Sequence, residues 1–88
     1  MNEIITEIVE YLNEKTRRRY NPETARTQRL IMARLREGFA VEDFKQVIDI
    51  KCKQWDHVPG DGQQDWRIYL RPSTLFGDKF DEYLNEPE

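Results

Sequence analysis

The chain has 88 residues, a net charge of −3, and 38% hydrophobic and 35% charged residues. A chain of this length builds one small domain, and its aromatic content separates it from intrinsically disordered sequences. The single cysteine excludes an internal disulfide and a cysteine zinc cluster, and the lack of a long apolar run excludes a membrane span. We therefore expect neither a metal nor another cofactor.

The charges are unevenly distributed along the chain. Residues 1–14 carry four acids and no base, residues 15–53 carry eleven bases and five acids, and residues 54–88 carry three bases and eight acids. A basic middle lies between acidic ends, so the negative total conceals a possible phosphate-facing surface. The N-terminus is acidic, rather than basic, ahead of its apolar residues, so we do not expect a signal peptide. We expect a cytoplasmic location.

Helical periodicity predicts two helices in the first half of the chain. The first is predicted over residues 3–14, with Ile4, Ile5, Ile8, Val9 and Leu12 on its inner face. The second is predicted over residues 22–37, where Asn21 could be the N-cap with Pro22 in the first position, and Thr24 is the competing cap. Thr27, Leu30, Ile31 and Leu35 form its inner stripe, and Gly38 ends it.

The second half contains one long helix and several short pieces. A helix is predicted over residues 42–55, with Phe44, Val47, Ile48, Cys52 and Trp55 facing inward. Pro59, Gly60 and Gly62 predict a loop over residues 56–65. The segment "WRIYL" is a possible short extended piece, "RPSTLF" a turn or helical turn, and residues 78–85 a last helix that begins with Asp78.

These elements predict a single all-α domain over residues 1–88, a compact bundle of four to five short helices. Aromatic side chains dominate burial in small cores. We therefore assign six aromatic residues to the core: Phe44, Trp55, Tyr69, Phe76, Phe80 and Tyr83.

Two cations interrupt the apolar stripes. Arg34 lies between Leu30, Ile31 and Leu35, and Lys51 lies among the inward residues of the third helix. A buried charge without a partner is costly, so each must pair with a carboxylate or a helix-end carbonyl, or extend to the rim of the core and bind a phosphate. Both alternatives stay open, and Arg71 belongs to the same class of structural or phosphate-facing cations.

The densest positive charge is the run "KTRRRY", followed by arginines on the outer face of the second helix. Exposed bases around a helix–loop–helix, with a ring beside them, suit contacts to a phosphate backbone and stacking on a base. The alternative is an ordinary solvated face. The candidate DNA-contacting residues are Arg17, Arg18, Arg19, Tyr20, Arg26, Arg29, Lys45 and Lys53.

Catalysis finds little support in the sequence. His57 is the only histidine, Ser73 has no histidine near it in sequence, and no glycine-rich phosphate loop occurs. Cys52 lies on the edge of an apolar stripe, where a small buried hydrophobic residue is expected rather than a nucleophile. We predict that the chain is not an enzyme.

Three blocks of the sequence resemble a known family. "EIVEYLNEKTRRRY", "LIMARLREGFAVEDFKQVIDIKCKQW" and "YLRPSTLFGDKFDEYLNE" resemble the conserved C-terminal domain of phage replication proteins, in the same order and over residues 5–85. That domain is found at the C-terminal end of replisome organisers and of replication-initiation proteins related to the primosome component DnaD. The matching positions are Tyr11, Leu12, Asn13, Thr16, Ile31, Arg34, Leu35, Gly38, Phe44, Val47, Ile48, Lys51, Trp55, Tyr69, Leu70, Arg71, Pro72, Thr74, Leu75, Phe76, Phe80, Tyr83 and Leu84.

The resemblance implies a non-catalytic module of phage or prophage DNA replication in a bacterial cytoplasm. No winged-helix region precedes it, so an excised domain or a short stand-alone product is expected. Related DnaD-type domains carry a Tyr-x-x-x-Ile-x-x-x-Trp signature linked to single-stranded DNA binding. Here Phe44 and Ile48 match its first spacing, but Trp55 follows Ile48 by seven residues. The resemblance therefore does not transfer that role.

Two functions remain as alternatives. The first is non-specific DNA binding through the basic middle during replisome assembly. The second is docking onto a host replicative helicase or its loader, or self-association, through the acidic first helix or the C-terminal "FDEYLNEPE". A domain without a ligand of its own is the third interpretation.

Overall fold

The structure is a computed structural model that describes residues 2–87. This part of the chain contains five α-helices, one 3-10 helix and no strand. The prediction of a small all-α bundle is confirmed. The elements are α1 (Asn2–Thr16), α2 (Ala25–Arg36), α3 (Val41–Trp55), η1 (Trp66–Tyr69), α4 (Pro72–Leu75) and α5 (Phe80–Leu84).

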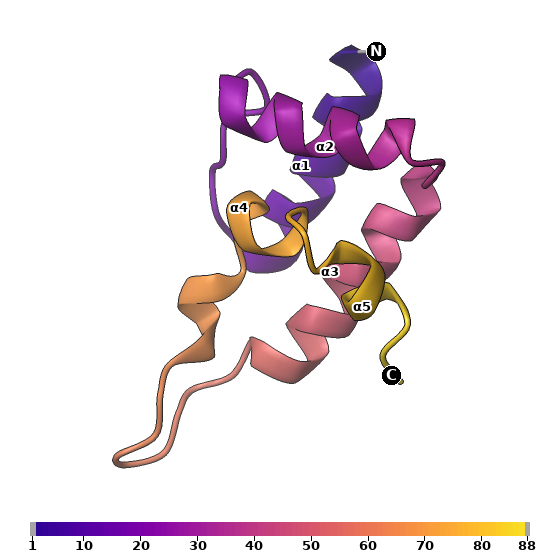
Figure 1. Ribbon diagram of the computed structural model, residues 1–88. Helices are drawn as coiled ribbons and strands as arrows, with labels where there is room; N and C mark the ends of the chain where they lie inside the picture. The colour runs from indigo at the N-terminus through magenta and orange to yellow at the C-terminus, as the bar shows by residue number, and fades with distance from the viewer. Residues whose placement is uncertain (1, 88) are drawn as a thin grey trace.

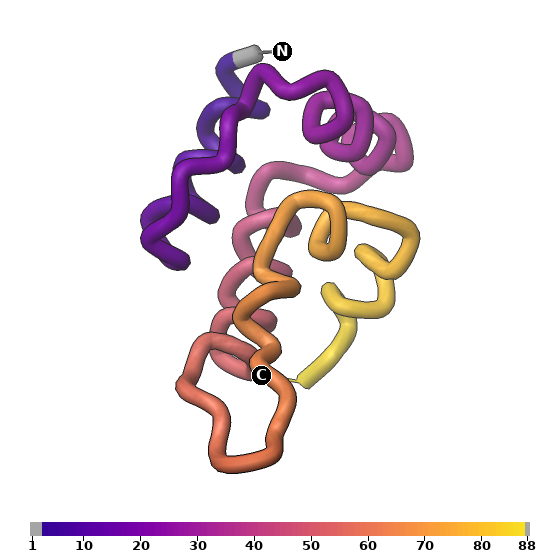
Figure 2. Tube along the Cα trace, turned by 90° about the vertical axis from the view of Figure 1, so that its left-hand side faces the viewer, coloured from indigo at the N-terminus to yellow at the C-terminus, as the bar shows by residue number. Residues whose placement is uncertain are grey.

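Helix α3 is the centre of the arrangement. It packs against α1 on one side and α5 on another, while α2 lies across one end of the bundle and contacts α4 (Figure 1). Residues 56–65 leave the end of α3 and extend away from the helices before returning at η1, as both views show (Figure 2). The excursion contributes to an elongated outline of 43 × 26 × 18 Å.

The core forms where α1, α2 and α3 meet the C-terminal segment. Ile5, Ile8, Val9 and Leu12 of the α1 stripe are fully buried, whereas Ile4 is partly buried. The Phe44 ring lies 5.3 Å from that of Phe76 and 4.8 Å from that of Phe80. These three phenylalanines are core residues, as predicted. Trp55, Tyr69 and Tyr83 are only half-buried, so their assignment to the core is corrected to its rim.

Several element ends differ from the prediction. Helix α2 begins at Ala25 rather than Pro22, with Thr24 at the N-cap position. The Asn21 side chain instead accepts a 2.8 Å hydrogen bond from the Glu23 amide, which closes a turn before the helix. Helix α5 begins at Phe80, two residues after Asp78.

The segment between the loop and α4 is helical rather than extended. Residues 66–69 form η1, whose first turn is held by the Asp65 carboxylate, which accepts a hydrogen bond from the Arg67 amide. A helix of a single turn is too short for its apolar residues to repeat at helical spacing, so the sequence pattern does not reveal it. Of the two possibilities for "RPSTLF", the helical turn is observed as α4.

None of the helices described here combines the length and the apolar character needed to cross a membrane.

Candidate nucleic-acid interface

Lys51 is a buried cation with a complete set of partners. Its side chain is 4% exposed, and Nζ lies 2.6 Å from Glu86 Oε1 and 2.9 Å from Gln54 Oε1. The same ammonium lies 4.5 Å from the ring centroid of Trp55 and 4.2 Å from that of Tyr83. These contacts match the carboxylate-pairing alternative, so Lys51 is removed from the phosphate-facing class.

Arg34 also serves the architecture. Its Nη1 donates a 2.7 Å hydrogen bond to the carbonyl oxygen of Gly77, in the turn that precedes α5. Its Nε lies 3.1 Å from Glu37 Oε1 as an ion pair, although the direction of the N–H does not make a hydrogen bond. Arg34 therefore ties α2 to the C-terminal segment, which accounts for a cation within an apolar stripe.

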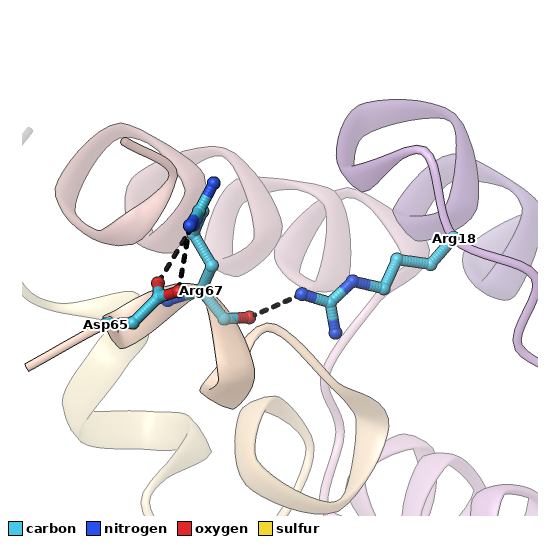
Figure 3. A network of polar contacts seen from close by, with 3 residues as sticks. All are labelled: Arg18, Asp65 and Arg67. Carbon is cyan, nitrogen blue, oxygen red and sulfur yellow. Dashed lines mark hydrogen bonds and ion pairs between the residues drawn. The ribbon is translucent and has the colours of Figure 1, made fainter. Parts of the chain in front are cut away.

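Two of the predicted DNA-contacting residues are used internally. Arg18 Nη2 donates a 2.9 Å hydrogen bond to the carbonyl oxygen of Arg67 (Figure 3). Its Nη1 lies 3.1 Å from the Tyr20 hydroxyl. The Tyr20 hydroxyl donates to the carbonyl oxygen of Leu70 at 3.0 Å, and its ring packs against the core. The predicted roles of Arg18 in phosphate contact and of Tyr20 in base stacking are therefore withdrawn.

The loop that follows α1 is fixed by Asn13. The Asn13 side chain bonds both main-chain groups of Tyr20, at 2.8 Å to its amide and 3.0 Å to its carbonyl oxygen. The Arg18 amide donates back to the Asn13 carbonyl at 3.1 Å, which requires Arg17 to adopt a left-handed φ of 60°. Arg17 and Arg19 are thereby held in exposed positions on an ordered loop.

The remaining predicted cations fall into two groups. Lys45 lies 2.8 Å from Glu7 Oε2, so its charge is already neutralised and it leaves the candidate set. Nine basic residues have no ion pair within residues 2–87: Arg17, Arg18, Arg19, Arg26, Arg29, Arg36, Lys53, Arg71 and Lys79. Among them Arg26, Arg29 and Arg36 are exposed and share one face of α2.

Four aromatic side chains form a cluster at the rim of the core, which we call the aromatic cluster: Trp55, Trp66, Tyr69 and Tyr83. The two indoles stack with centroids 5.7 Å apart and planes at 21°. Tyr69 contacts both, at 6.2 Å from Trp55 and 5.3 Å from Trp66. Trp66 is 45% exposed, so the cluster presents a large ring to solvent.

Sequence reasoning missed Trp66. A signal was present, because this tryptophan directly follows a Pro- and Gly-rich loop and has no apolar partner at helical spacing on its N-terminal side. An aromatic residue that fits no buried stripe is a candidate for a surface contact.

All four residues of the aromatic cluster line a groove that adjoins a second, smaller one. The larger, which we call the aromatic groove, has a volume of about 540 Å³ and is bordered by the cluster, by Arg71 and by Lys79. The smaller, which we call the α2 groove, has about 220 Å³ and is bordered by Tyr20, Arg26 and Leu30. Arg71 and Ser73 line both grooves, so they lie where the two meet.

Arg71 is exposed and keeps its charge available. Its Nε donates a 3.0 Å hydrogen bond to the Thr74 hydroxyl, and its guanidinium carbon lies 5.4 Å from the Tyr69 ring centroid. No ion pair engages it within residues 2–87. Of the two classes considered for Arg71, the phosphate-facing one is compatible with this geometry.

The pKa values of Asp65 and Cys52 argue against a binding or nucleophilic role for either side chain. A hydrogen bond from Arg67 lowers the pKa of Asp65 to about 2, so both groups stay charged and occupied with each other (Figure 3). Burial raises the pKa of the Cys52 thiol to about 11, which makes it a poor nucleophile at neutral pH. Across residues 2–87, no three His, Cys, Asp or Glu side chains are placed to hold a metal ion.

Comparison with known families gives a match over most of the chain. The family described as "Conserved phage C-terminus" matches residues 8–85, which include most of α1 and every later helix. The matched segment contains both grooves. Comparisons with curated proteins and with solved structures found no significant match.

Proposed function

Since the chain belongs to the conserved phage C-terminus family, we propose that it is a non-catalytic accessory domain of phage or prophage DNA replication that binds DNA non-specifically. The replication context comes from the three sequence blocks that resemble replisome organisers and DnaD-related initiation proteins. The binding role comes from the cations that the fold leaves exposed. The bacterial cytoplasm is the compartment in which such a domain acts.

The observation that carries the proposal is a set of exposed arginines in the basic middle of the chain that make no ion pair within residues 2–87. Arg17 and Arg19 extend from the loop after α1, and Arg26 and Arg29 extend from α2. Arginine suits phosphate because its planar guanidinium can donate two parallel hydrogen bonds to it. Contacts to phosphate do not distinguish one base from another, so the binding that they support is independent of the DNA sequence.

The test is a fluorescence anisotropy titration of a labelled 20-base-pair duplex at several salt concentrations. We expect the Arg26→Ala/Arg29→Ala variant to bind more weakly and to reduce the slope of log K against log salt by about two. Lys45→Ala is the matched control, because Lys45 is already paired with Glu7 and should contribute nothing to the slope. Equal slopes for the double variant and the wild type would remove α2 from the interface.

The acidic face of α1 favours a second candidate function, docking of a basic protein such as a host helicase or its loader. Glu3, Glu7, Glu10 and Glu14 line a groove of about 480 Å³ together with Tyr11. Lys45 lines the same groove and pairs with Glu7, so the face keeps a net negative charge. Such a face attracts a partner of the opposite sign, and a second copy of this chain offers one through α2. In the C-terminal acidic segment, Glu86 is already paired with Lys51, and Glu88 lies outside the described residues.

A pull-down from a phage host extract, with and without nuclease, separates the two functions. Retention of basic replication proteins after nuclease treatment supports docking, whereas loss of all captured protein supports DNA binding.

A further inference from the structure

The aromatic groove combines an exposed ring platform with exposed positive charge. Trp66 is 45% exposed, and Trp55 stacks behind it at 5.7 Å, so the outer indole is supported. An exposed tryptophan alone is common on protein surfaces. This one is held by a second indole and by Tyr69, whose hydroxyl accepts a 2.8 Å hydrogen bond from Gln64. The platform is therefore fixed before any ligand binds.

The charge at this groove is suited to phosphate. Arg71 and Lys79 line it, both are exposed, and neither makes an ion pair within residues 2–87. Asp78 is the one acidic residue among the lining side chains of the described chain. Ser73 is exposed, and its hydroxyl group adds a hydrogen-bond donor where the two grooves meet.

The two grooves together define a path. From Trp66 the aromatic groove leads to Arg71 and Ser73, and from there the α2 groove leads to Arg26. The path thus begins with stacking rings and continues with guanidinium groups. A flexible chain of alternating rings and phosphates has the chemistry to follow it.

We infer that the aromatic groove binds single-stranded nucleic acid, with an unpaired base stacked on Trp66 and the adjoining phosphates on Arg71 and Lys79. This inference rests on the proposed DNA-binding function and specifies the strand state that the domain prefers. A duplex keeps its bases stacked on one another, so it offers no free base face to Trp66. A duplex can still contact the arginines of α2 through its backbone.

The experiment compares two probes, a fluorescein-labelled 20-nucleotide oligothymidylate and a labelled 20-base-pair duplex, both at 100 mM salt. We expect Trp66→Ala to weaken oligothymidylate binding about tenfold, the loss typical of one base–aromatic stack. Duplex binding should change less than twofold. Ile68→Ala is the matched control, because Ile68 lies on the same 3-10 helix, is 49% exposed and does not line the groove.

Each outcome bears on a different part of the inference. If the wild type binds the duplex but Trp66→Ala binds oligothymidylate as the wild type does, the groove assignment is overturned while the proposed function stands. If the wild type binds neither probe, both fail. If circular dichroism shows that Trp66→Ala is unfolded, Arg71→Gln provides the test instead. A retained oligothymidylate affinity in Arg71→Gln would then overturn the inference.

Discussion

Arg17 combines an unfavourable backbone conformation with an exposed positive charge. Its φ of 60° is the left-handed conformation that usually falls to glycine at the end of a helix. For a residue with a β-carbon this conformation costs about 1 kcal/mol. The chain keeps an arginine there, and its side chain is exposed beside a second exposed arginine, Arg19.

We predict that Arg17→Gly increases stability and weakens DNA binding at the same time. Relief of the left-handed strain should add about 0.5–1 kcal/mol to the free energy of unfolding, which urea denaturation measures. Loss of one phosphate contact should reduce duplex affinity about fivefold at 0.1 M salt. Arg17→Ala is the control, because it removes the same charge without relieving the strain. An unchanged affinity in both variants would show that Arg17 lies off the DNA path.

At this scale the sequence predicts charge well and side-chain use poorly. The run "KTRRRY" does form a cationic loop, but its side chains alternate in environment. Arg17 and Arg19 are exposed. Arg18 and Tyr20 donate hydrogen bonds to carbonyl groups of the segment around η1. Those carbonyls come from residues about fifty positions later, so no local pattern indicates them. The support of Trp66 is equally non-local, because Trp55, the ring stacked on it, comes from another element.

At the scale of elements, the Lys51–Glu86 pair fastens the segment after α5 to the end of α3. The hydrogen bond from Lys51 lowers the pKa of Glu86, and a second one from Gln54 acts in the same direction. A carboxyl group whose pKa is lower in the folded state stabilises the fold above its unfolded pKa of about 4.3. That contribution is lost as the pH falls through the lower, folded value.

We predict that replacing Lys51 and replacing Glu86 affect stability to different extents. Lys51→Met replaces a buried ammonium by an apolar chain of similar size, so the free energy of unfolding should change by less than about 1 kcal/mol. Glu86→Gln leaves the ammonium buried without an anion and should cost about 1–2 kcal/mol at pH 7, a figure reduced because the Glu86 carboxylate is partly exposed.

The pH profile gives a second readout of the same variants. Stability of the wild type should fall as the pH drops below the unfolded pKa of about 4.3 toward the lower, folded pKa of Glu86, and Glu86→Gln should show a shallower fall, because the titrating group is gone. Denaturant melts at several pH values measure this. A Lys51→Met variant as unstable as Glu86→Gln would contradict the account, because it would mean that the ammonium itself stabilises the core.

Element prediction succeeded where helical periods repeat. Helices α1 and α3 extend over about four turns, so their apolar stripes identified them and their bounds agree to within two residues. The start of α2 was placed three residues too early, because Asn21-Pro22 forms a turn that has the same composition as a helix cap. The pieces from residue 66 onward were harder, because each has one turn or little more.

For the whole molecule, the net charge of −3 opposes DNA binding. A surface on which positive charges are concentrated can offset that repulsion, so the arrangement of the charges is as important as their sum. Charge segregation along the chain predicted a basic surface. Folding modifies it, because Lys45 is paired with an α1 acid and Lys51 with the C-terminal segment, while Arg71 and Lys79 from the acidic third of the chain join the grooves. The charge counts of the three sequence segments do not predict which cations are paired and which line the grooves.

The last prediction concerns the acids of α1 as a group. Changing Glu3, Glu10 and Glu14 to Gln raises the net charge from −3 to 0 and leaves Glu7, the partner of Lys45, in place. If these acids act on DNA only at long range, duplex affinity should rise about threefold at 20 mM salt. It should change less than twofold at 150 mM, where the screening length is about 8 Å.

Anisotropy titrations at the two salt concentrations measure this difference, and the triple variant also tests the docking function. A large gain at 150 mM would place α1 beside the bound DNA, which contradicts a path along the aromatic and α2 grooves. Loss of protein partners in a nuclease-treated pull-down, with DNA affinity at 150 mM unchanged, would assign α1 to protein docking. The two charged faces would then serve different ligands, because screening at this salt confines the influence of each to its own surroundings.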